Sequence, residues 1–240
     1  MKVDLRPIYI YVKAALIKRR PFISSGVIIF ILVASIIGLS YEGKGMKYLP
    51  SKPGLDSLIN LETPDTRLLE QAIFISINTY RLKNKQPILI WSDTLFKASQ
   101  YHLSNMITKK FFDHDDPNDS KYPDLSKRVK KYYGNYKTLG ENLIQHFPYK
   151  FKGKTIEYNI KKVNGKYVYS DPINNKPLQR ITYRQFADEV VYNWSISPPH
   201  KENMMNGKYR RLGIAVHVPK YNLSPYIVPV TVVTDFSSYQ

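Results

Sequence analysis

The sequence predicts an α+β domain in which helices flank a small sheet, and two patterns along the chain support this. Apolar residues recur at helical spacing between residues 66 and 106 and again between residues 182 and 194. After Tyr209 the pattern changes to alternation and β-branched residues, which is typical of strands. At 240 residues and 43% hydrophobic content, the chain can form one large domain or two small ones with a real core.

A hydrophobic segment long enough to cross a membrane precedes the predicted domain. Residues 21–41 form a run of 21 uncharged residues, which as a helix would extend about 30 Å. Six basic residues lie within 1–20 and three lysines follow within 42–52, so the basic excess predicts a cytoplasmic tail over 1–20 and a main domain outside the membrane. The length favours an uncleaved anchor, and small residues near Ala34 and Gly38 leave a cleaved signal peptide as the alternative.

Residues 42–65 are predicted to be a linker, because glycine, proline and lysine are frequent there and no periodicity is sustained. The folded domain is expected over 66–240. A chain without cysteine has neither a disulfide framework nor a thiolate metal site. The apolar core must therefore hold this domain together.

Helix starts are predicted from capping residues. Thr63 is expected to cap the first helix, with proline at its first position, and Ser92 is expected to open the second. A short third helix is predicted over 124–133, and Thr182 is expected to cap a fourth.

An insertion at about 147–181 contains a predicted hairpin, because Asn164-Gly165 separates two strand-like runs. Nine basic and two acidic residues lie between Lys150 and Arg184, within a formal net charge of +17 for the chain. One interpretation is an electropositive surface that contacts anionic cell-wall polymer or lipid head groups. The alternative is a solvated insertion. Nucleic acid is not an expected partner, because no recognition motif is present and an exported domain seldom meets it.

Three short segments carry the polar residues that suggest chemistry. They are Phe111-Phe112-Asp113-His114, Gly140-Glu141-Asn142, and the Trp-Ser-Ile-Ser-Pro-Pro-His-Lys-Glu-Asn segment of residues 194–203. Their order resembles the CAP superfamily of cysteine-rich secretory proteins, antigen 5 and pathogenesis-related protein 1, and most closely its bacterial SCP-like extracellular branch. The resemblance extends over residues 66–238, and it implies a three-layer α-β-α sandwich with a small, mainly antiparallel sheet.

The resemblance also implies a central cleft lined by His114, Glu141 and His200, with Ser197 on the segment that carries His200. Two histidines and a glutamate with an open position can bind a divalent metal such as zinc. The family's second glutamate, expected three residues after Trp194, is replaced by Ser197, so one acidic ligand is missing. Glu141 has a structural alternative, in which it caps a helix or binds backbone amides. No catalytic residue is assigned.

Two classes of function follow. The first is a membrane-anchored, extracytoplasmic binding module that captures a polar, glycan or lipid ligand at the cell envelope. The second is a hydrolase in which histidine and glutamate activate water, directly or through a metal. Binding is favoured, because the polar residues include no evident nucleophile and a fold does not determine an activity.

Overall fold

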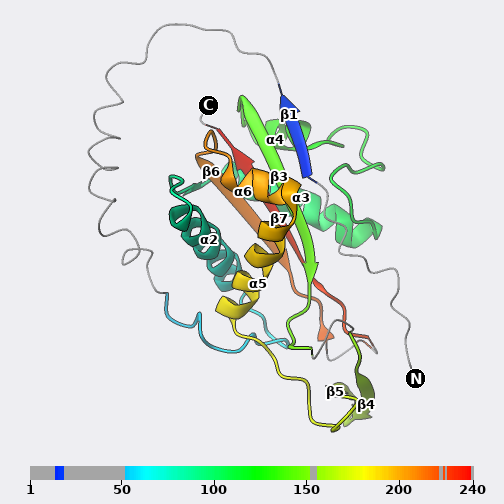
Figure 1. Cartoon of the computed structure of the whole chain (residues 1–240). Helices are drawn as coiled ribbons and strands as arrows, with labels where there is room; N and C mark the ends of the chain where they lie inside the picture. The colour runs from blue at the N-terminus through cyan, green and yellow to red at the C-terminus, as the bar shows by residue number, and fades with distance from the viewer. Residues whose placement is uncertain (1–13, 19–51, 152–155, 222–223, 225, 239–240) are drawn as a thin grey trace, which may run out of the picture.

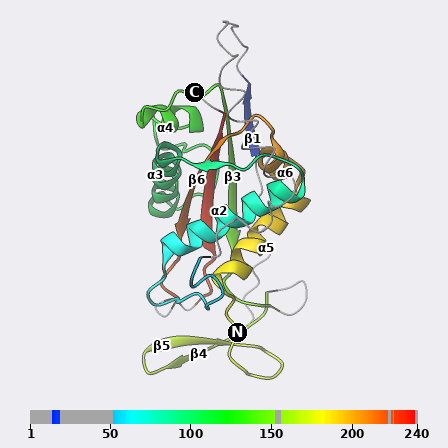
Figure 2. The ribbon, with the colours of Figure 1, turned by 90° about the vertical axis from the view of Figure 1, so that its left-hand side faces the viewer.

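The protein is a three-layer α-β-α sandwich. The structure is a computed structural model that describes residues 14–18, 52–151, 156–221, 224 and 226–238. Helices α3 (Asp93–Lys109) and α4 (Leu125–Lys131) lie on one side of the central sheet, whereas α2 (Thr66–Lys83), α5 (Tyr183–Ile196) and α6 (Pro198–Met205) lie on the other (Figures 1 and 2). The α+β class and the three layers that the sequence predicted are confirmed.

The central sheet has five strands in the order β1-β3-β7-β6-β2. Their bounds are β1 (Ala14–Lys18), β2 (Ile90–Trp91), β3 (Thr138–His146), β6 (Arg211–His217) and β7 (Val230–Ser237). Every neighbouring pair is antiparallel except β2 with β6, which is parallel. The sheet is therefore mainly antiparallel, as predicted.

The alternation of side chains along β3 decides which residues can meet. Leu139 and Leu143 pack in clusters with side chains of α3 and α4, whereas Ile144 packs in the larger core with α2 and α5. Successive strand residues point to opposite faces. Glu141 therefore faces α3 and α4, and Asn142 faces the layer that contains α5 and α6.

Two of the predicted helix caps are confirmed and one is wrong. Ser92 caps α3 by accepting from the Leu95 amide, and Thr182 forms a capping box at the start of α5. The first helix begins at Thr66 with Asp65 as its cap, and Thr63 does not serve. A carboxylate two residues further on takes the role, because the Asp65 side chain accepts from the Leu68 amide at 2.9 Å.

The folded domain begins earlier than the sequence predicted. Leu55, Ile59 and Leu61 are buried in the main core, although they lie within the segment expected to be a linker. The Ile59 amide donates to the Ile181 carbonyl at 3.1 Å, so backbone pairing also ties this segment to the residues before α5. Three isolated apolar residues show too little periodicity for the sequence to predict a packed segment.

The predicted hairpin is confirmed. Strands β4 (Asn159–Val163) and β5 (Lys166–Ser170) pair antiparallel and extend from one end of the sandwich (Figure 1). Asn164 and Gly165 both have positive φ, 48° and 79°, as a two-residue hairpin turn requires.

The predicted membrane span lies outside the described residues. No helix within the described part of the chain is long and apolar enough to cross a membrane. The nearest described segment is β1, which pairs with Thr138–Asn142 at the edge of β3.

Candidate functional site

The loop after α3 carries His114, and the position of this loop depends on where α3 ends. Lys110 ends α3 in the left-handed conformation, with φ of 58°, and its amide donates to the Met106 carbonyl. The chain then turns back toward the sheet. His102, about two turns before the end of α3, binds the Asp113 carbonyl through Nε2 at 2.8 Å and so fixes the residue next to His114.

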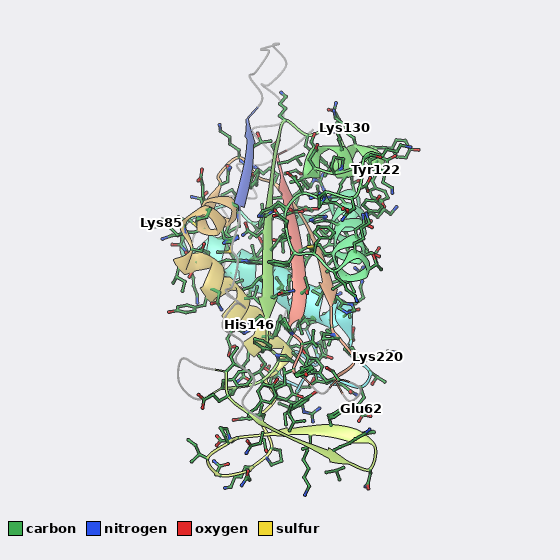
Figure 3. The ribbon with its side chains drawn as sticks, turned by 90° about the vertical axis from the view of Figure 1, so that its right-hand side faces the viewer. Glu62, Lys85, Tyr122, Lys130, His146 and Lys220 are labelled. Carbon is green, nitrogen blue, oxygen red and sulfur yellow. The ribbon has the colours of Figure 1, made fainter. Side chains whose placement is uncertain are left out.

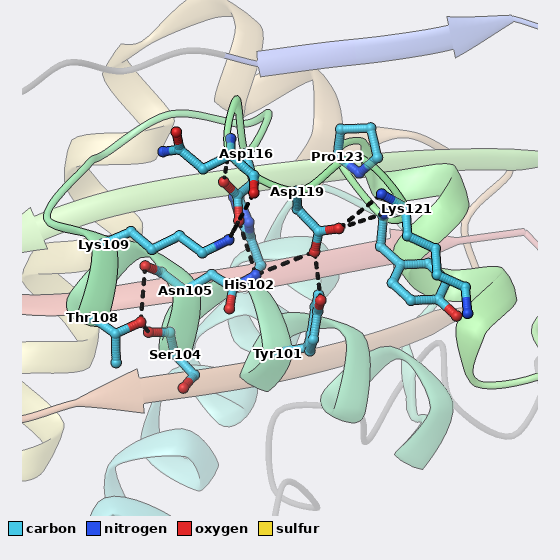
Figure 4. Close-up of polar contacts among 12 residues, drawn as sticks. Tyr101, His102, Ser104, Asn105, Thr108, Lys109, Asp116, Asp119, Lys121 and Pro123 are labelled. Atoms are coloured by element: carbon cyan, nitrogen blue, oxygen red, sulfur yellow. Dashed lines mark hydrogen bonds and ion pairs between the residues drawn. The ribbon is translucent and has the colours of Figure 1, made fainter.

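Two acidic residues hold the rest of this loop in place (Figure 4). Asp116 accepts from Lys109 Nζ at 2.7 Å and from Asn105 Nδ2 at 2.8 Å. Asp119 accepts from the Tyr101 hydroxyl and from the amides of the two residues Lys121 and Tyr122. Because these carboxylates are already bonded within the protein, they stabilise the loop and are not free to bind a cation.

His114, Glu141 and Arg128 form a buried ionic cluster between the sheet and the α3–α4 layer. His114 Nδ1 lies 2.7 Å from Glu141 Oε1, and Arg128 Nη2 lies 2.8 Å from Glu141 Oε2. Both carboxylate oxygens are thus bound by protein donors. Arg128 and Glu141 are each 0% exposed, and His114 is 7% exposed. The cluster is closed to solvent.

Arg128 also organises the residues around it. Its Nη1 donates to the carbonyls of His114, at 3.0 Å, and Pro123, at 2.9 Å. Burial by itself would raise the pKa of Glu141, but the charge of Arg128, together with the neighbouring histidines, holds this pKa below its ordinary value. Glu141 is therefore an anion whose countercharge comes from within the protein.

A second carboxyl group lies beside Glu141. Asp235 of β7 is the cross-strand neighbour of Glu141 on one side and of Gly213 on the other. Burial, followed by the negative charge of Glu141, raises the pKa of Asp235 well above its ordinary value. Burial also lowers the pKa of His102. Both neighbours are thereby favoured in their neutral forms, and Glu141 and Arg128 remain as the charged pair.

Gly213 explains how a helix can lie so close to these acids. A Cβ at this position would stand 2.2 Å from the Phe96 nitrogen and 2.6 Å from the Leu95 Cβ. Only glycine permits this approach of α3 to β6. The close contact seals one side of the ionic cluster.

The opposite face of the sheet carries a neutral amide network. Asn142 donates through Nδ2 to the His200 carbonyl at 3.1 Å, and its Oδ1 accepts from Asn203 Nδ2 at 2.9 Å. Asn203 Nδ2 also donates to the Glu141 carbonyl at 3.1 Å. A Cβ at Gly140 would come within 2.5 Å of Asn203 Oδ1. The three residues of Gly-Glu-Asn therefore act on two faces, and its glycine and asparagine join α6 to β3.

The predicted site residues fall into two pairs. The structure brings His114 to Glu141, and it brings His200 to Ser197, whose Oγ lies 2.9 Å from His200 Nδ1. The two pairs are tied to neighbouring residues of β3 that point to opposite faces, because Asn142 binds the His200 carbonyl whereas Glu141 binds His114.

A metal does not fit the predicted ligand set. Among the described residues, no three histidine, aspartate or glutamate side chains are grouped so that they could hold a metal ion. Glu141 is occupied by His114 and Arg128, and the guanidinium supplies the positive charge that a cation would bring. The expectation that His114, Glu141 and His200 share a zinc ion is therefore not supported by their placement.

Sequence reasoning missed Arg128, Asp235 and Asn203. Arg128 lies in a short helix rich in lysine, where a basic residue is easily taken for a solvated one. Asp235 offered a usable signal, because it is the one charged residue of a strand of apolar and hydroxyl side chains, and such residues are seldom fully buried without a partner. Asn203 lies three residues after His200 in α6, and nothing in the sequence of that helix indicates a specific role for its side chain.

An open hollow of the described domain lies elsewhere, between α2 and α5. It has a volume of about 450 Å³. Its lining mixes tyrosine, hydroxyl, charged and aliphatic side chains from the two helices: Ala72, Ile75, Ser76, Thr79, Tyr80, Lys83, Arg184, Asp188, Val191, Tyr192 and Ser195, with Leu55. Ser76 donates to Asp188 at 2.8 Å across it. This α2–α5 groove can admit a ligand without any opening of the sandwich.

Comparisons with known proteins agree with this architecture. A family model described as CAP, the cysteine-rich secretory protein family, matches residues 75–234. No curated protein matches the chain. Among solved structures, an extracellular protein with an SCP domain from Bacillus anthracis is 18% identical over 74% of this chain and 43% of its own, with a TM-score of 0.47.

Two further solved structures are similar at the same distant level. An outer surface protein of Borrelia burgdorferi is 17% identical over 73% of this chain and 96% of its own, with a TM-score of 0.48. A cysteine-rich secretory protein from Staphylococcus aureus is 13% identical over 73% of this chain and 40% of its own, with a TM-score of 0.44. The chain thus spans less than half the length of two of these three proteins. The family model covers two thirds of the 240 residues, and the chain belongs to the cysteine-rich secretory protein (CAP) family.

Proposed function

We propose that this CAP-domain protein is a binding module of the cell envelope, anchored to the membrane by residues 21–41, with its domain on the extracytoplasmic side. The observation that carries the binding role is the closed ionic cluster. Glu141 is fully buried and both of its oxygens are bound by His114 and Arg128. A group in this state stabilises a fold, and it neither meets a substrate nor needs a metal.

The α2–α5 groove is the place where a ligand would bind. Its two tyrosines, Tyr80 and Tyr192, offer flat surfaces for a sugar ring or an acyl chain, and Tyr192 is 62% exposed. Lys83 and Asp188 supply polar contacts of both signs. A polar glycan or lipid ligand matches this lining better than a purely apolar one.

A hydrolase is the second candidate, and one contact favours it. Glu141 accepts from His114 Nδ1 and so orients an imidazole whose Nε2 is buried and has no hydrogen-bond partner within the described residues. An oriented imidazole of this kind can serve as a general base. Burial of the ring opposes this role, because water must reach Nε2.

The Ser197–His200 pair is a weaker basis for catalysis. Ser197 caps α6, and the next two residues, Pro198 and Pro199, have no amide hydrogen to stabilise an oxyanion. The contact between Ser197 and His200 joins two residues that are three positions apart at the start of a helix, as local side-chain contacts there often do. We assign it to the structure of the α5–α6 corner.

Binding and hydrolysis can be separated in one experiment. The purified protein is incubated with cell-wall sacculi and, separately, with phosphatidylglycerol vesicles, and both bound protein and released soluble fragments are measured. We expect retention without release, weakened by Tyr80→Ala and Tyr192→Ala and unchanged by Tyr133→Ala, since Tyr133 is 95% exposed and lies outside the groove. Release of fragments that disappears in the Glu141→Gln protein would establish the hydrolase instead.

Membrane anchoring has its own test, because β1 and an anchor exclude each other. A chain that crosses the membrane at 21–41 places 14–18 and β3 on opposite sides, so β1 cannot pair there. The chain has no cysteine, and Lys18 and Thr138 are cross-strand partners. In cells, Lys18→Cys with Thr138→Cys should therefore form no disulfide. Efficient crosslinking in the membrane fraction would show that β1 stays on the domain and that the proposed anchor is incorrect.

A further inference from the structure

The β4–β5 hairpin has one exposed face, whose contact with the rest of the described domain is the ion pair between Lys166 and Glu62. We propose that this face docks on the surface of an anionic lipid bilayer and so holds the domain in one orientation at the membrane. The proposal adds a second contact to the anchored, extracytoplasmic arrangement proposed above and rests on it for the position of the membrane.

The composition of this outward face is basic and apolar together. Lys161 is opposite Val168, and Val163 is opposite Lys166, so these four side chains share one face of the hairpin. All four are exposed, and the two valines are 41% and 38% exposed. Strand propensity explains a valine at each position, and the exposure of both side chains leaves their apolar surface available to a partner. Lysine beside valine matches the boundary between lipid head groups and acyl chains.

The other face of the hairpin fixes it to the domain. Tyr169 is 5% exposed, and its hydroxyl donates to the Tyr221 carbonyl at 2.9 Å and to the Ser224 carbonyl at 2.7 Å. Ile160 packs against the same core. The hairpin is therefore held against the sandwich, and its outward face keeps a defined direction.

The hairpin lies at the end of the molecule where the described domain begins. Lys166 forms an ion pair with Glu62 at 2.8 Å, and Figure 3 shows Glu62 beside the hairpin and Lys130 at the opposite end. Eleven residue steps separate Tyr41 from Lys52, so an extended chain can span at most about 37 Å between the proposed anchor and the domain. A short tether at this end brings the hairpin close to the lipid surface.

Charge selects an anionic surface as the partner. Residues 156–180 contain five basic and two acidic residues. One acid, Asp171, accepts from the amides of Ile173 and Asn174. Lys166 shares its charge with Glu62, and both side chains remain more than half exposed. Basic residues near an anionic leaflet each contribute roughly a fivefold gain in binding.

The test uses the full-length protein in vesicles, with one cysteine for labelling. Val168→Cys carries an environment-sensitive fluorophore, and Lys130→Cys carries the same label as the matched control. In equimolar phosphatidylglycerol and phosphatidylcholine, we expect the emission at 168 to move to shorter wavelength and to be quenched by nitroxide lipids. In phosphatidylcholine alone, the emission of the label at 168 should neither shift nor be quenched. The emission of the label at 130 should stay unchanged in both kinds of vesicle.

The charges are tested by adding Lys161→Gln and Lys166→Gln to the labelled protein. Loss of two basic residues should shift the docking equilibrium about thirtyfold toward the undocked state. Both lysines are exposed, so the fold should remain intact, which the melting temperature checks. Quenching at 168 that is absent in anionic vesicles, or equal in neutral ones, would overturn the proposal.

The remaining outcomes separate this inference from the proposed anchor. One outcome is that the protein floats with anionic vesicles only and stops floating when Lys161→Gln and Lys166→Gln are introduced. This result would show that the hairpin docks and that residues 21–41 do not anchor the protein. If it floats with all vesicles while the label at 168 never responds, the anchor holds and the docking inference fails. A response at 168 to soluble polyglycerol phosphate but not to vesicles would assign the face to wall polymer and overturn the lipid partner.

Discussion

The two faces of β3 solve the same packing problem with different chemistry. On the α3–α4 face, Glu141 is joined to a helix and a loop through charges, with Arg128 at 2.8 Å and His114 at 2.7 Å. On the α5–α6 face, Asn142 is joined to α6 through neutral amides, with Asn203 at 2.9 Å and the His200 carbonyl at 3.1 Å. Consecutive residues of one motif thus serve two layers.

The difference between the faces lies in what happens when one partner is lost. Removal of a neutral hydrogen-bond partner exposes the desolvation cost of one dipole, whereas removal of one member of a buried ion pair leaves a charge without compensation. We therefore expect the ionic face to be the more sensitive one. Each prediction below tests this contrast.

The largest effect is expected at Arg128. Arg128→Met leaves Glu141 as an uncompensated buried anion, and the free energy of unfolding should fall by about 3–5 kcal/mol in urea titrations. Adding Glu141→Gln removes the charge and should recover part of this loss. Lys127→Ala is the control, because its side chain is 54% exposed and should change stability by less than about 0.5 kcal/mol. A loss below about 1 kcal/mol for Arg128→Met would mean that the pair contributes no more than a surface ion pair does.

A smaller effect is expected on the amide face. Asn203→Ala leaves Asn142 Oδ1 and the Glu141 carbonyl without their shared donor, so the free energy of unfolding should fall by about 2 kcal/mol. Lys201→Ala, at an exposed position of α6, provides the comparison. If Asn203→Ala costs as much as Arg128→Met, charge is not what separates the two faces.

A pH profile sharpens the contrast further. Because the pKa of Asp235 is raised by burial and by Glu141, folding takes up a proton, and this group's contribution to stability is fullest below about pH 4 and falls as pH rises. Asp235→Asn should remove that fall and stabilise the protein at neutral pH, because an amide cannot ionise in the buried position. The measurement is the free energy of unfolding of the parent and of the Asp235→Asn protein, taken from about pH 4 to neutral pH. A profile of Asp235→Asn parallel to that of the parent would contradict the raised pKa.

The smallest effect is expected from metal. Arg128 already neutralises Glu141, and among the described residues no three histidine, aspartate or glutamate side chains are grouped to hold a metal ion. A chelator, or added zinc, should therefore shift the melting temperature by less than about 1 °C, compared with 2–4 °C for each kcal/mol in a domain of this size. A larger zinc-dependent rise that is lost in His114→Ala would show that a site forms after all.

Several features of this protein followed from local chemistry and could be predicted. Ser92 and Thr182 cap helices because a hydroxyl there satisfies a free amide, and Asn164-Gly165 turns a hairpin because both residues tolerate positive φ. The order of the polar segments resembled one family, and that resemblance implied the three layers. The helix caps and the hairpin turn depend on neighbours within a few residues. The family's polar segments form a pattern that can be read without knowledge of tertiary contacts.

The candidate site was predictable only in part. The close pairing of His114 with Glu141 followed the family resemblance, whereas the opposite directions of Glu141 and Asn142 became clear only when the structure placed both residues in β3. Which helices cover each face is a long-range matter. Without knowledge of that long-range packing, the buried role of Leu55 and Ile59 could not be seen.

By itself, the sequence determined the segments that can cross a membrane, turn, cap a helix or carry the family's polar residues. Only the tertiary structure decided that the charge on Glu141 is balanced by Arg128, 13 positions away, and that burial beside Glu141 raises the pKa of Asp235. The reason is physical. A charged side chain is stable in the interior only when its partner reaches it in space, and the packing of α4 and β7 against β3 brings those groups together.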